Sequence, residues 1–178
     1  MTLRAYLDFF PLLGTGAWVD PAALVIGQVT LGEDASVWPF ALLRGDINTI
    51  RVGARTNIQD GCVLHVVHDG PFCPGGLGLH IGADVTVGHK AVVHAATVGD
   101  RCLIGMGAII TDGAVIEDDV IVGAGSVVAP GKRLTAGGRY IGTPARRVRD
   151  LTYREREQIP YTAAHYVRVK ENHRRSGG

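Results

Sequence analysis

The sequence predicts an all-β solenoid over roughly residues 15–145, in which the chain winds as a three-sided coil that a C-terminal α-helical segment follows. Three observations predict this fold: aliphatic residues recur at every sixth position, glycine and small residues recur beside them, and no helical period fits the same stretch. The repeating aliphatic positions are Val25, Leu31, Val37, Leu43, Val52, Ile58, Leu64, Ile81, Val87, Val93, Val98, Ile104, Ile110, Ile116, Val122 and Val128.

A step of six residues suits a triangular coil better than a helix or an ordinary strand. A helix needs apolar residues three and four apart, and each glycine inside it costs about 1 kcal/mol. In a three-sided coil each hexad is a short strand plus a turn, three hexads complete one rung, and the aliphatic side chains stack inward. Glycine often follows the aliphatic residue, as at Gly53, Gly82 and Gly105, and we expect it at turns because it adopts positive φ cheaply.

Two breaks in the register mark places where the coil is interrupted. From Leu43 to Val52 the step is nine residues, and from Leu64 to Ile81 it is 17. The second gap contains HDGPFCPGGLG, whose prolines and glycines predict a loop that leaves the coil. Loops on a rigid scaffold often carry function, so we expect functional residues near these breaks.

The hexad pattern ends near Pro144, so we divide the chain into a coil over residues 1–147 and a helical segment over 148–178. Thr152 followed three residues later by Glu155 is a capping-box signature for a helix start. Pro160 is expected to interrupt this helix, and a second helix is expected from Tyr161. We expect the helical segment to lie back on the coil.

Composition excludes several classes of partner. The chain has 178 residues with 18 basic and 17 acidic side chains, and this balance gives no reason to expect nucleic acid or an anionic membrane. The three cysteines are widely spaced, which favours reduced thiols and a cytoplasmic protein. No stretch approaches a membrane span, and the apolar run near the N-terminus is too short for a signal peptide.

Three histidines are candidate metal ligands. His65 and His94 each follow an inward aliphatic residue and therefore point outward, and His89 lies two residues after Val87. Three imidazoles are the ligand number of a catalytic zinc with one open position. Five residues of a triangular coil lead to the next side, so His89 and His94 can share a metal only if a second copy of the chain supplies one of them. A single outward histidine is most often an ordinary surface residue, and spacing alone leaves both interpretations open.

Three stretches taken together resemble the γ-class carbonic anhydrases of the hexapeptide-repeat superfamily. They are LLRGDIN, TNIQDGCVLH and VGHKAVVH, which carry Arg-x-Asp, Gln-Asp-x4-His and His-x4-His in order and in hexad context. The resemblance implies a left-handed parallel β-helix and a homotrimer. It also implies that His65 and His94 of one subunit, with His89 of its neighbour, bind zinc, with iron or cobalt as alternatives.

The resemblance also implies roles for residues around the histidines. Arg44 and Asp46 would belong to a salt-bridge system between subunits, with Asp60 as a structural residue and the possible partner of Arg44. Gln59 would orient the solvent on the metal by hydrogen bonding. Tyr166 is the C-terminal residue expected to reach the site.

Tyr161 is the rival of Tyr166, and plain helix packing is an equal alternative for both. The founding type of the family has glutamates after the Arg-x-Asp element and in the loop that help to move protons. Here Ile47 follows Asp46, and Asp69 is the one acid between Val66 and His80. We therefore hypothesise that His68, or else His80, carries protons out of the site, since imidazole titrates near neutral pH.

The function that the resemblance implies is the hydration of CO2 to bicarbonate by zinc-bound hydroxide at trimer interfaces. The alternatives are a non-catalytic metal-binding or assembly homologue, and a CoA-thioester hydrolase or acyltransferase, which other hexapeptide-repeat proteins resemble. Metal content measured together with CO2 hydration separates these cases.

Overall fold

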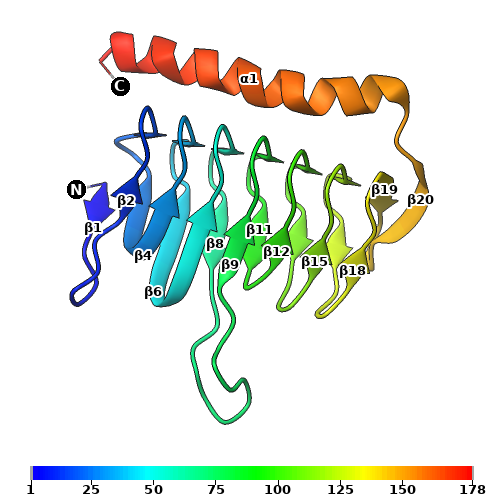
Figure 1. Cartoon of the computed structure of the whole chain (residues 1–178), viewed down its shortest axis with the longest axis horizontal. Coiled ribbons are helices and arrows are strands. Elements are labelled where there is room, and N and C mark those ends of the chain that lie inside the picture. The colour runs from blue at the N-terminus through cyan, green and yellow to red at the C-terminus, as the bar shows by residue number, and fades with distance from the viewer. Residues whose placement is uncertain (1, 178) are drawn as a thin grey trace.

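The computed structural model describes residues 2–177 as a left-handed parallel β-helix of triangular cross-section, with one long helix along one side (Figure 1). Successive rungs stack by parallel pairing, for example between Val93 and Ile110 and between Val87 and Ile104. The solenoid predicted from the six-residue repeat is therefore confirmed. Three flat faces, called A, B and C below, run the length of the coil.

Faces A and B form one sheet because two long strands run around the corner between them. Face A contains β1 (Leu3–Arg4), the first part of β4 (Leu24–Leu31), the first part of β6 (Leu42–Val52), β8 (Val63–His65), β11 (Val92–His94), β14 (Ile109–Ile110) and β17 (Val127–Val128). Face B contains β2 (Leu12–Leu13), the second parts of β4 and β6, β9 (Leu79–Ile81), β12 (Thr97–Val98), β15 (Val115–Ile116) and β18 (Arg133–Leu134).

Face C is a separate sheet, and the helix packs against it. Its strands are β3 (Trp18–Val19), β5 (Ser36–Val37), β7 (Asn57–Ile58), β10 (Thr86–Val87), β13 (Leu103–Ile104), β16 (Ile121–Val122), β19 (Gly138–Ile141) and β20 (Arg146–Asp150). The last strand pairs antiparallel with β19 and leads the chain out of the coil. It also runs across the boundary between residues 147 and 148 that we drew from the sequence.

The core is the stack of aliphatic side chains that the repeat predicts. All sixteen positions are buried, and none is more than 3% exposed. Burying an aliphatic side chain of this size contributes roughly 1.5–3 kcal/mol, so the stack is the main source of stability. It fixes the outward direction of every residue that follows an inward position.

The glycines after the inward residues are explained differently from our expectation. Gly53 and Gly105 do not have positive φ; instead, a Cβ at Gly53 would lie 2.4 Å from the carbonyl carbon of Gly82, and one at Gly105 would lie 2.4 Å from the nitrogen of Ala124. These glycines are needed because adjacent rungs approach too closely for any side chain. Positive φ occurs further along the turn, at glycines such as Gly107 and at charged residues such as Arg55.

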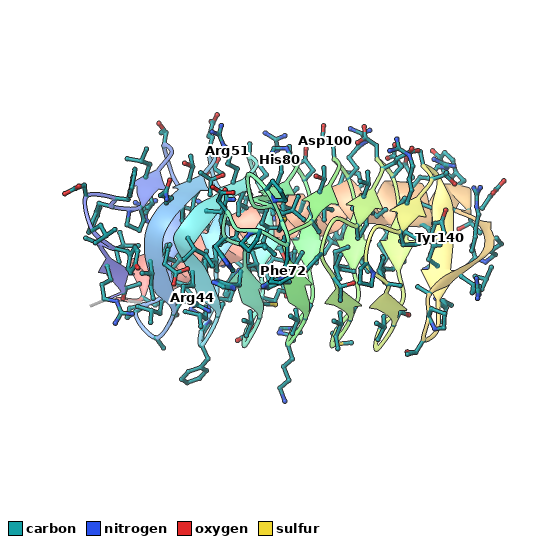
Figure 2. The ribbon with its side chains drawn as sticks, turned by 90° about the horizontal axis from the view of Figure 1, so that it is seen from below. Arg44, Arg51, Phe72, His80, Asp100 and Tyr140 are labelled. Carbon is teal, nitrogen blue, oxygen red and sulfur yellow. The ribbon has the colours of Figure 1, made fainter. Side chains whose placement is uncertain are left out.

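The two register breaks are located where the sequence placed them. The extra residues after Leu43 are absorbed in β6, whose pairing with β4 shifts register between Gly27 and Val29. The segment between β8 and β9 is the long loop that leaves the coil in Figure 1. Asn48 ties its base to the coil by donating to the carbonyl of Val67 at 3.1 Å, and Phe72 is fully exposed on the side that faces the viewer in Figure 2.

The helical segment is one continuous helix, α1 (Tyr153–Arg175), so the expectation of two helices was wrong. The capping box of Thr152 and Glu155 is confirmed at its start. Pro160 removes one backbone donor but faces solvent, while Ile159 and Ala163 on either side of it are buried against the coil. Docking on face C therefore keeps the helix continuous through the proline, and the buried Lys170 pairs with Asp34 at 2.9 Å near the other end.

In the described part of the chain, no helix combines the length and the apolar character that a membrane span requires. Cys62, Cys73 and Cys102 are all free thiols. Burial raises the pKa of both Cys62 and Cys102 to about 12, so these two side chains stay protonated and pack as small apolar groups.

Candidate metal centre

His65 and His94 occupy the same position on neighbouring rungs of face A. His65 ends β8, His94 ends β11, and the two residues are paired in register. Each follows a buried aliphatic residue, so its side chain points out of the coil as the hexad predicts. Nδ1 of His65 lies 3.1 Å from Nε2 of His94. The fold thus brings together two of the three histidines that the sequence singled out.

A carboxylate lies beside the other ring nitrogen of each of these histidines. Oδ1 of Asp46 is 3.1 Å from Nε2 of His65, and Oδ1 of Asp112 is 2.5 Å from Nδ1 of His94. Arg44 donates to the second carboxylate oxygen of Asp46, so the Arg-x-Asp element forms an ion pair within the chain. Asp112 lies outside the sequence motifs, and only its place two residues after the inward Ile110 could have pointed to it.

Burial disfavours the charged form of both Asp46 and His65, and their hydrogen bonds oppose this effect. Burial raises the pKa of Asp46, but hydrogen bonds from Arg44 and His65 outweigh it and hold that pKa below its ordinary value of 3.8. Burial lowers the pKa of His65 and outweighs the hydrogen bond with Asp46, which raises it, and the charge of Arg44 adds to the lowering. At neutral pH the carboxylate is therefore charged and the imidazole is neutral, which is the form that can bind a metal ion.

His89 lies at the opposite edge of face A. It precedes β11, whereas His94 ends that strand. Nδ1 of His89 is 2.8 Å from Oδ2 of Asp60, so Asp60 pairs with His89 inside the chain. The contact between Asp60 and Arg44 of a neighbouring subunit stays a prediction.

Gln59 is held beside His89 by a buried network of amides. Its Oε1 accepts a hydrogen bond from the backbone nitrogen of His89 at 3.2 Å, and its Nε2 donates to Oδ1 of Asn57 at 3.0 Å. Asn57 in turn donates to Oγ1 of Thr86 at 3.0 Å. These contacts fix which end of the Gln59 amide is the donor, and they leave one of its two N–H groups unused.

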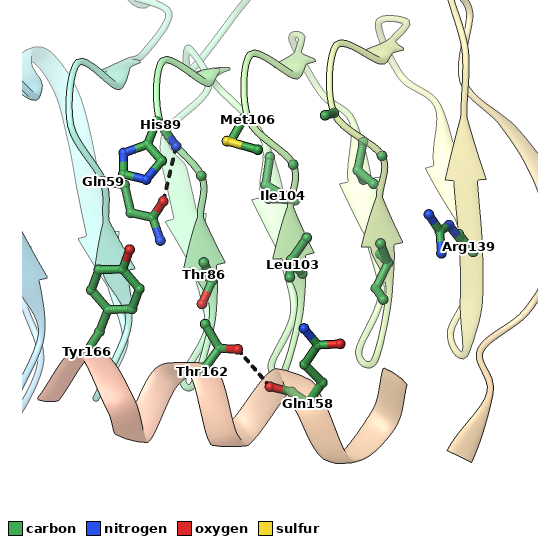
Figure 3. A pocket seen from close by; sticks show the side chains of 16 residues that line it. Gln59, Thr86, His89, Leu103, Ile104, Met106, Arg139, Gln158, Thr162 and Tyr166 are labelled. Atoms are coloured by element: carbon green, nitrogen blue, oxygen red, sulfur yellow. Dashed lines mark hydrogen bonds between the residues drawn. The ribbon is translucent and has the colours of Figure 1, made fainter. Parts of the chain in front are cut away.

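A cavity of about 360 Å³ lies between face C and α1, next to His89 and Gln59. Figure 3 shows Tyr166 rising from the helix with its hydroxyl toward Gln59. Burial raises the pKa of Tyr166, and the charge of Asp60 raises it further, so the phenol stays protonated. Tyr161 does not line this cavity; it is exposed and stacks on His165. The cavity also has an apolar wall that the sequence did not indicate, to which Leu103, Met106 and Ile121 contribute.

Within residues 2–177 no group of three histidine, cysteine or carboxylate side chains is arranged to hold a metal ion. His89 belongs to one edge of face A, and the pair of His65 and His94 belongs to the other. The single chain can therefore offer two imidazoles at one place and one imidazole at another.

The two candidate proton carriers are both on the surface. His68 is exposed at the start of the long loop, three residues after His65, and His80 is exposed on β9 of face B. Only His68 is close in sequence to a candidate ligand. Its role in proton transfer stays a prediction.

Comparison with known proteins agrees with the fold and the motifs. Residues 95–130 match the family model described as bacterial transferase hexapeptide (six repeats). The chain is 48% identical over 171 residues to the protein YrdA of Escherichia coli (strain K12), covering 96% of this chain and 93% of the relative. It is 39% identical over 152 residues to the carbonic anhydrase of Geobacillus kaustophilus, covering 84% of this chain and 80% of the relative.

The chain belongs to the γ-class carbonic anhydrase-like family of hexapeptide-repeat proteins. The resemblance inferred from the three motifs is thus confirmed. A crystal structure of a hexapeptide transferase family protein from Anaplasma phagocytophilum is also similar, with a TM-score of 0.87 and 34% identity over 96% of this chain and 97% of that chain. Proteins similar to this chain therefore carry names that point to different activities.

Proposed function

We propose that this protein is a zinc-dependent carbonic anhydrase that works as a homotrimer, with iron or cobalt as substitutes for zinc. One observation carries the proposal: two imidazoles face one another at one edge of face A, and a third stands beside an ordered glutamine and a cavity at the other edge. Three copies of the chain placed edge to edge would each complete the ligand set of a neighbour. This arrangement would give three sites, each built from two subunits.

The residues fit a zinc ion. Nδ1 of His65 and Nε2 of His94 face each other at 3.1 Å, and a neutral imidazole nitrogen is a preferred zinc ligand. A carboxylate stands behind both rings, an arrangement that commonly orients histidines bound to zinc. Three imidazoles would leave the open position that a catalytic site needs.

The surrounding residues have separate tasks in the proposed reaction. Bound zinc would supply Lewis-acid activation of water at neutral pH. The unused N–H of Gln59 would hold a reacting oxygen, since the rest of its amide is already fixed by Asn57 and the backbone of His89. Tyr166 would donate a second hydrogen bond from the helix side, and the apolar wall around Met106 would accept CO2 while keeping bulk water out.

Proton export is the step for which this chain differs from the founding type. Ile47 stands after Asp46 where that type has a glutamate, and the loop between Val66 and His80 contains no glutamate. His68 is exposed and three residues from His65, so we propose it as the proton carrier. Replacing His68 by alanine should slow turnover at low buffer concentration, and added imidazole should restore it; unchanged turnover at low buffer would show that His68 has no such role.

The test of the proposal combines three measurements on one sample. Protein purified without added zinc is analysed for metal content, for mass in solution, and for CO2 hydration by stopped flow. We expect one metal ion per chain, a trimeric mass and hydration that a strong chelator removes and zinc restores. A monomer that retains both metal and turnover would contradict the interface site.

Two other functions have an observation in their favour. A non-catalytic metal-binding or assembly role is supported by the missing glutamates, and it predicts metal without turnover. A CoA-thioester hydrolase or acyltransferase is supported by the apolar groove under α1 and by the similar hexapeptide transferase structure, and it predicts turnover of thioesters without any need for metal.

A further inference from the structure

The corner of the coil after His94 is one residue shorter than the corner stacked on it. From Val93 to Val98 the step is five residues, whereas from Ile110 to Ile116 on the next rung it is six. Val93 pairs with Ile110 before the corner, and the backbone nitrogen of Gly113 donates to the carbonyl of Ala95 at 2.8 Å after it.

Ala95 and Gly113 both have positive φ, and each lies three residues before the next inward residue, so the two corners correspond from these residues onward. Between the paired inward residues and this point, the rung of His94 has one residue and the rung stacked on it has two. The lower rung has His94 alone, and the upper rung has Thr111 and Asp112. Asp112 is therefore the surplus residue of its rung. It has no counterpart to stack on, and its side chain reaches the ring of His94 instead, with Oδ1 at 2.5 Å from Nδ1.

Both sides of this corner are held by hydrogen bonds. Ala95 is buried with φ of +46°, and its nitrogen donates to the carbonyl of His65 at 2.9 Å. A left-handed alanine costs on the order of 1 kcal/mol, so the surrounding contacts must impose this conformation. On the upper rung the hydroxyl of Thr111 donates to the carbonyl of Val128 at 2.6 Å.

We propose that Asp112 is a positioning residue for His94: it accepts the N–H of Nδ1 and so leaves Nε2 as a bare lone pair directed at His65. The proposal rests on the function proposed above, in which His94 is a metal ligand. The hydrogen bond at one ring nitrogen decides which tautomer is present and fixes the plane of the ring.

A carboxylate also lies beside a ring nitrogen of each of the other two candidate ligands, which supports this assignment. Asp60 lies 2.8 Å from Nδ1 of His89, and Asp46 lies 3.1 Å from Nε2 of His65. Asp46 also receives a hydrogen bond from Arg44, so its charge is shared between two partners. The contact of Asp112 with His94 is the shortest of the three, and we expect its removal to have the clearest effect.

The first experiment measures the tautomer of His94 in metal-free protein by nitrogen-15 NMR of labelled histidine. We expect the wild type to carry the proton on Nδ1, and Asp112→Ala to populate the form with the proton on Nε2. Asp112→Asn should retain the wild-type tautomer, since its amide oxygen can still accept the hydrogen bond. Thr111→Ala is the matched control, because it loosens the same corner without touching the imidazole.

The second experiment measures zinc affinity by competition with a chelator. Removal of such an outer partner typically weakens metal binding roughly 10- to 100-fold, and we expect a loss in that range for Asp112→Ala and a smaller one for Asp112→Asn. Thr111→Ala should bind zinc like the wild type.

The proposal is overturned if the tautomer of His94 is the same with and without Asp112, or if Asp112→Ala and Thr111→Ala lose affinity equally. If Asp112→Ala shifts the tautomer as expected but the wild type takes up no zinc, the metal site is refuted and the role of Asp112 in fixing the tautomer stands.

Discussion

Two stretches of the coil differ in how strictly they keep the six-residue step. From Val98 to Leu134 the inward residues follow one another at six without a break, whereas between Leu43 and Val98 the step is in turn nine, 17 and five residues at three places. All candidate site residues of the coil except Asp112 belong to the second stretch. The comparison shows that regular rungs build the scaffold, and that the rungs of irregular length lie where most of the candidate site residues gather.

The largest effect is expected at the irregular stretch. His94→Ala should abolish zinc retention and lower CO2 hydration by at least roughly 100-fold, because it removes a ligand and leaves an incomplete set. Unfolding by denaturant should change little, since the side chain lies on the surface of the coil. His165→Ala, which removes an exposed imidazole from α1, is the control. Full hydration by the His94 variant would exclude this site as the source of activity.

The regular stretch should respond in stability and not in chemistry. Ile110→Ala removes a fully buried side chain from the stack and should lower the free energy of unfolding by about 2–5 kcal/mol. Ile109→Ala on the same strand, where the side chain is 39% exposed, should cost far less. Chemical denaturation measures both variants, and equal losses would mean that Ile110 does not belong to the central stack.

Rung spacing can be tested with two neighbouring glycines. Gly105→Ala places a methyl group 2.4 Å from a backbone nitrogen of the next rung and should cost about 1–3 kcal/mol of stability. Gly107 has positive φ and nothing within 4 Å of an added Cβ, so Gly107→Ala should cost only about 1 kcal/mol of backbone strain. If Gly107→Ala is the more damaging of the two, backbone conformation and not rung contact determines these positions.

The smallest effect concerns the start of α1. Hydrogen bonds from Arg149, and to a smaller extent from Thr152 and Arg139, hold the pKa of Glu155 well below its ordinary value of 4.5. A carboxyl group whose pKa is lowered by folding stabilises the folded state at pH values above its ordinary pKa. That contribution is lost as the pH falls toward the folded-state pKa. Glu155→Gln should therefore lower the melting temperature by roughly 2–4 °C at pH 7.

The pH dependence separates charge from helix capping. Glutamine can keep the capping geometry but not the ion pairs. The difference in melting temperature between the wild type and Glu155→Gln should therefore narrow steadily below pH 4.5. A gap that stays the same at every pH would show that the ion pairs with Arg139 and Arg149 contribute nothing.

The features that could be predicted from the sequence are those with a local signal. The inward stack follows from spacing alone, the loop after His65 follows from its prolines and glycines, and the helix start follows from Thr152 and Glu155. The outward direction of His65 and His94 also follows, because each comes directly after an inward residue. These features need no knowledge of which rung lies above which.

The features that were missed depend on contacts between distant segments. Asp112 reaches His94 only because two corners of unequal length are stacked, and the helix passes through Pro160 only because face C supports both sides of it. Gly53 was predicted to be needed for a turn, whereas it is needed because the next rung lies too close for a side chain. In the local sequence, a glycine looks the same in both cases. The pairing of Asp60 with His89 likewise joins residues from successive rungs.

The long helix changes how this coil should melt. A stack of rungs can fray one turn at a time from either end, because each rung contacts only its neighbours. Here α1 is fastened near one end of the coil by Glu155 with Arg139, and near the other by Lys170 with Asp34 and by His173 against Trp18. An end rung cannot peel away unless the helix detaches as well. The helix therefore converts a structure that could fray gradually into one that we expect to lose its order in a single cooperative step.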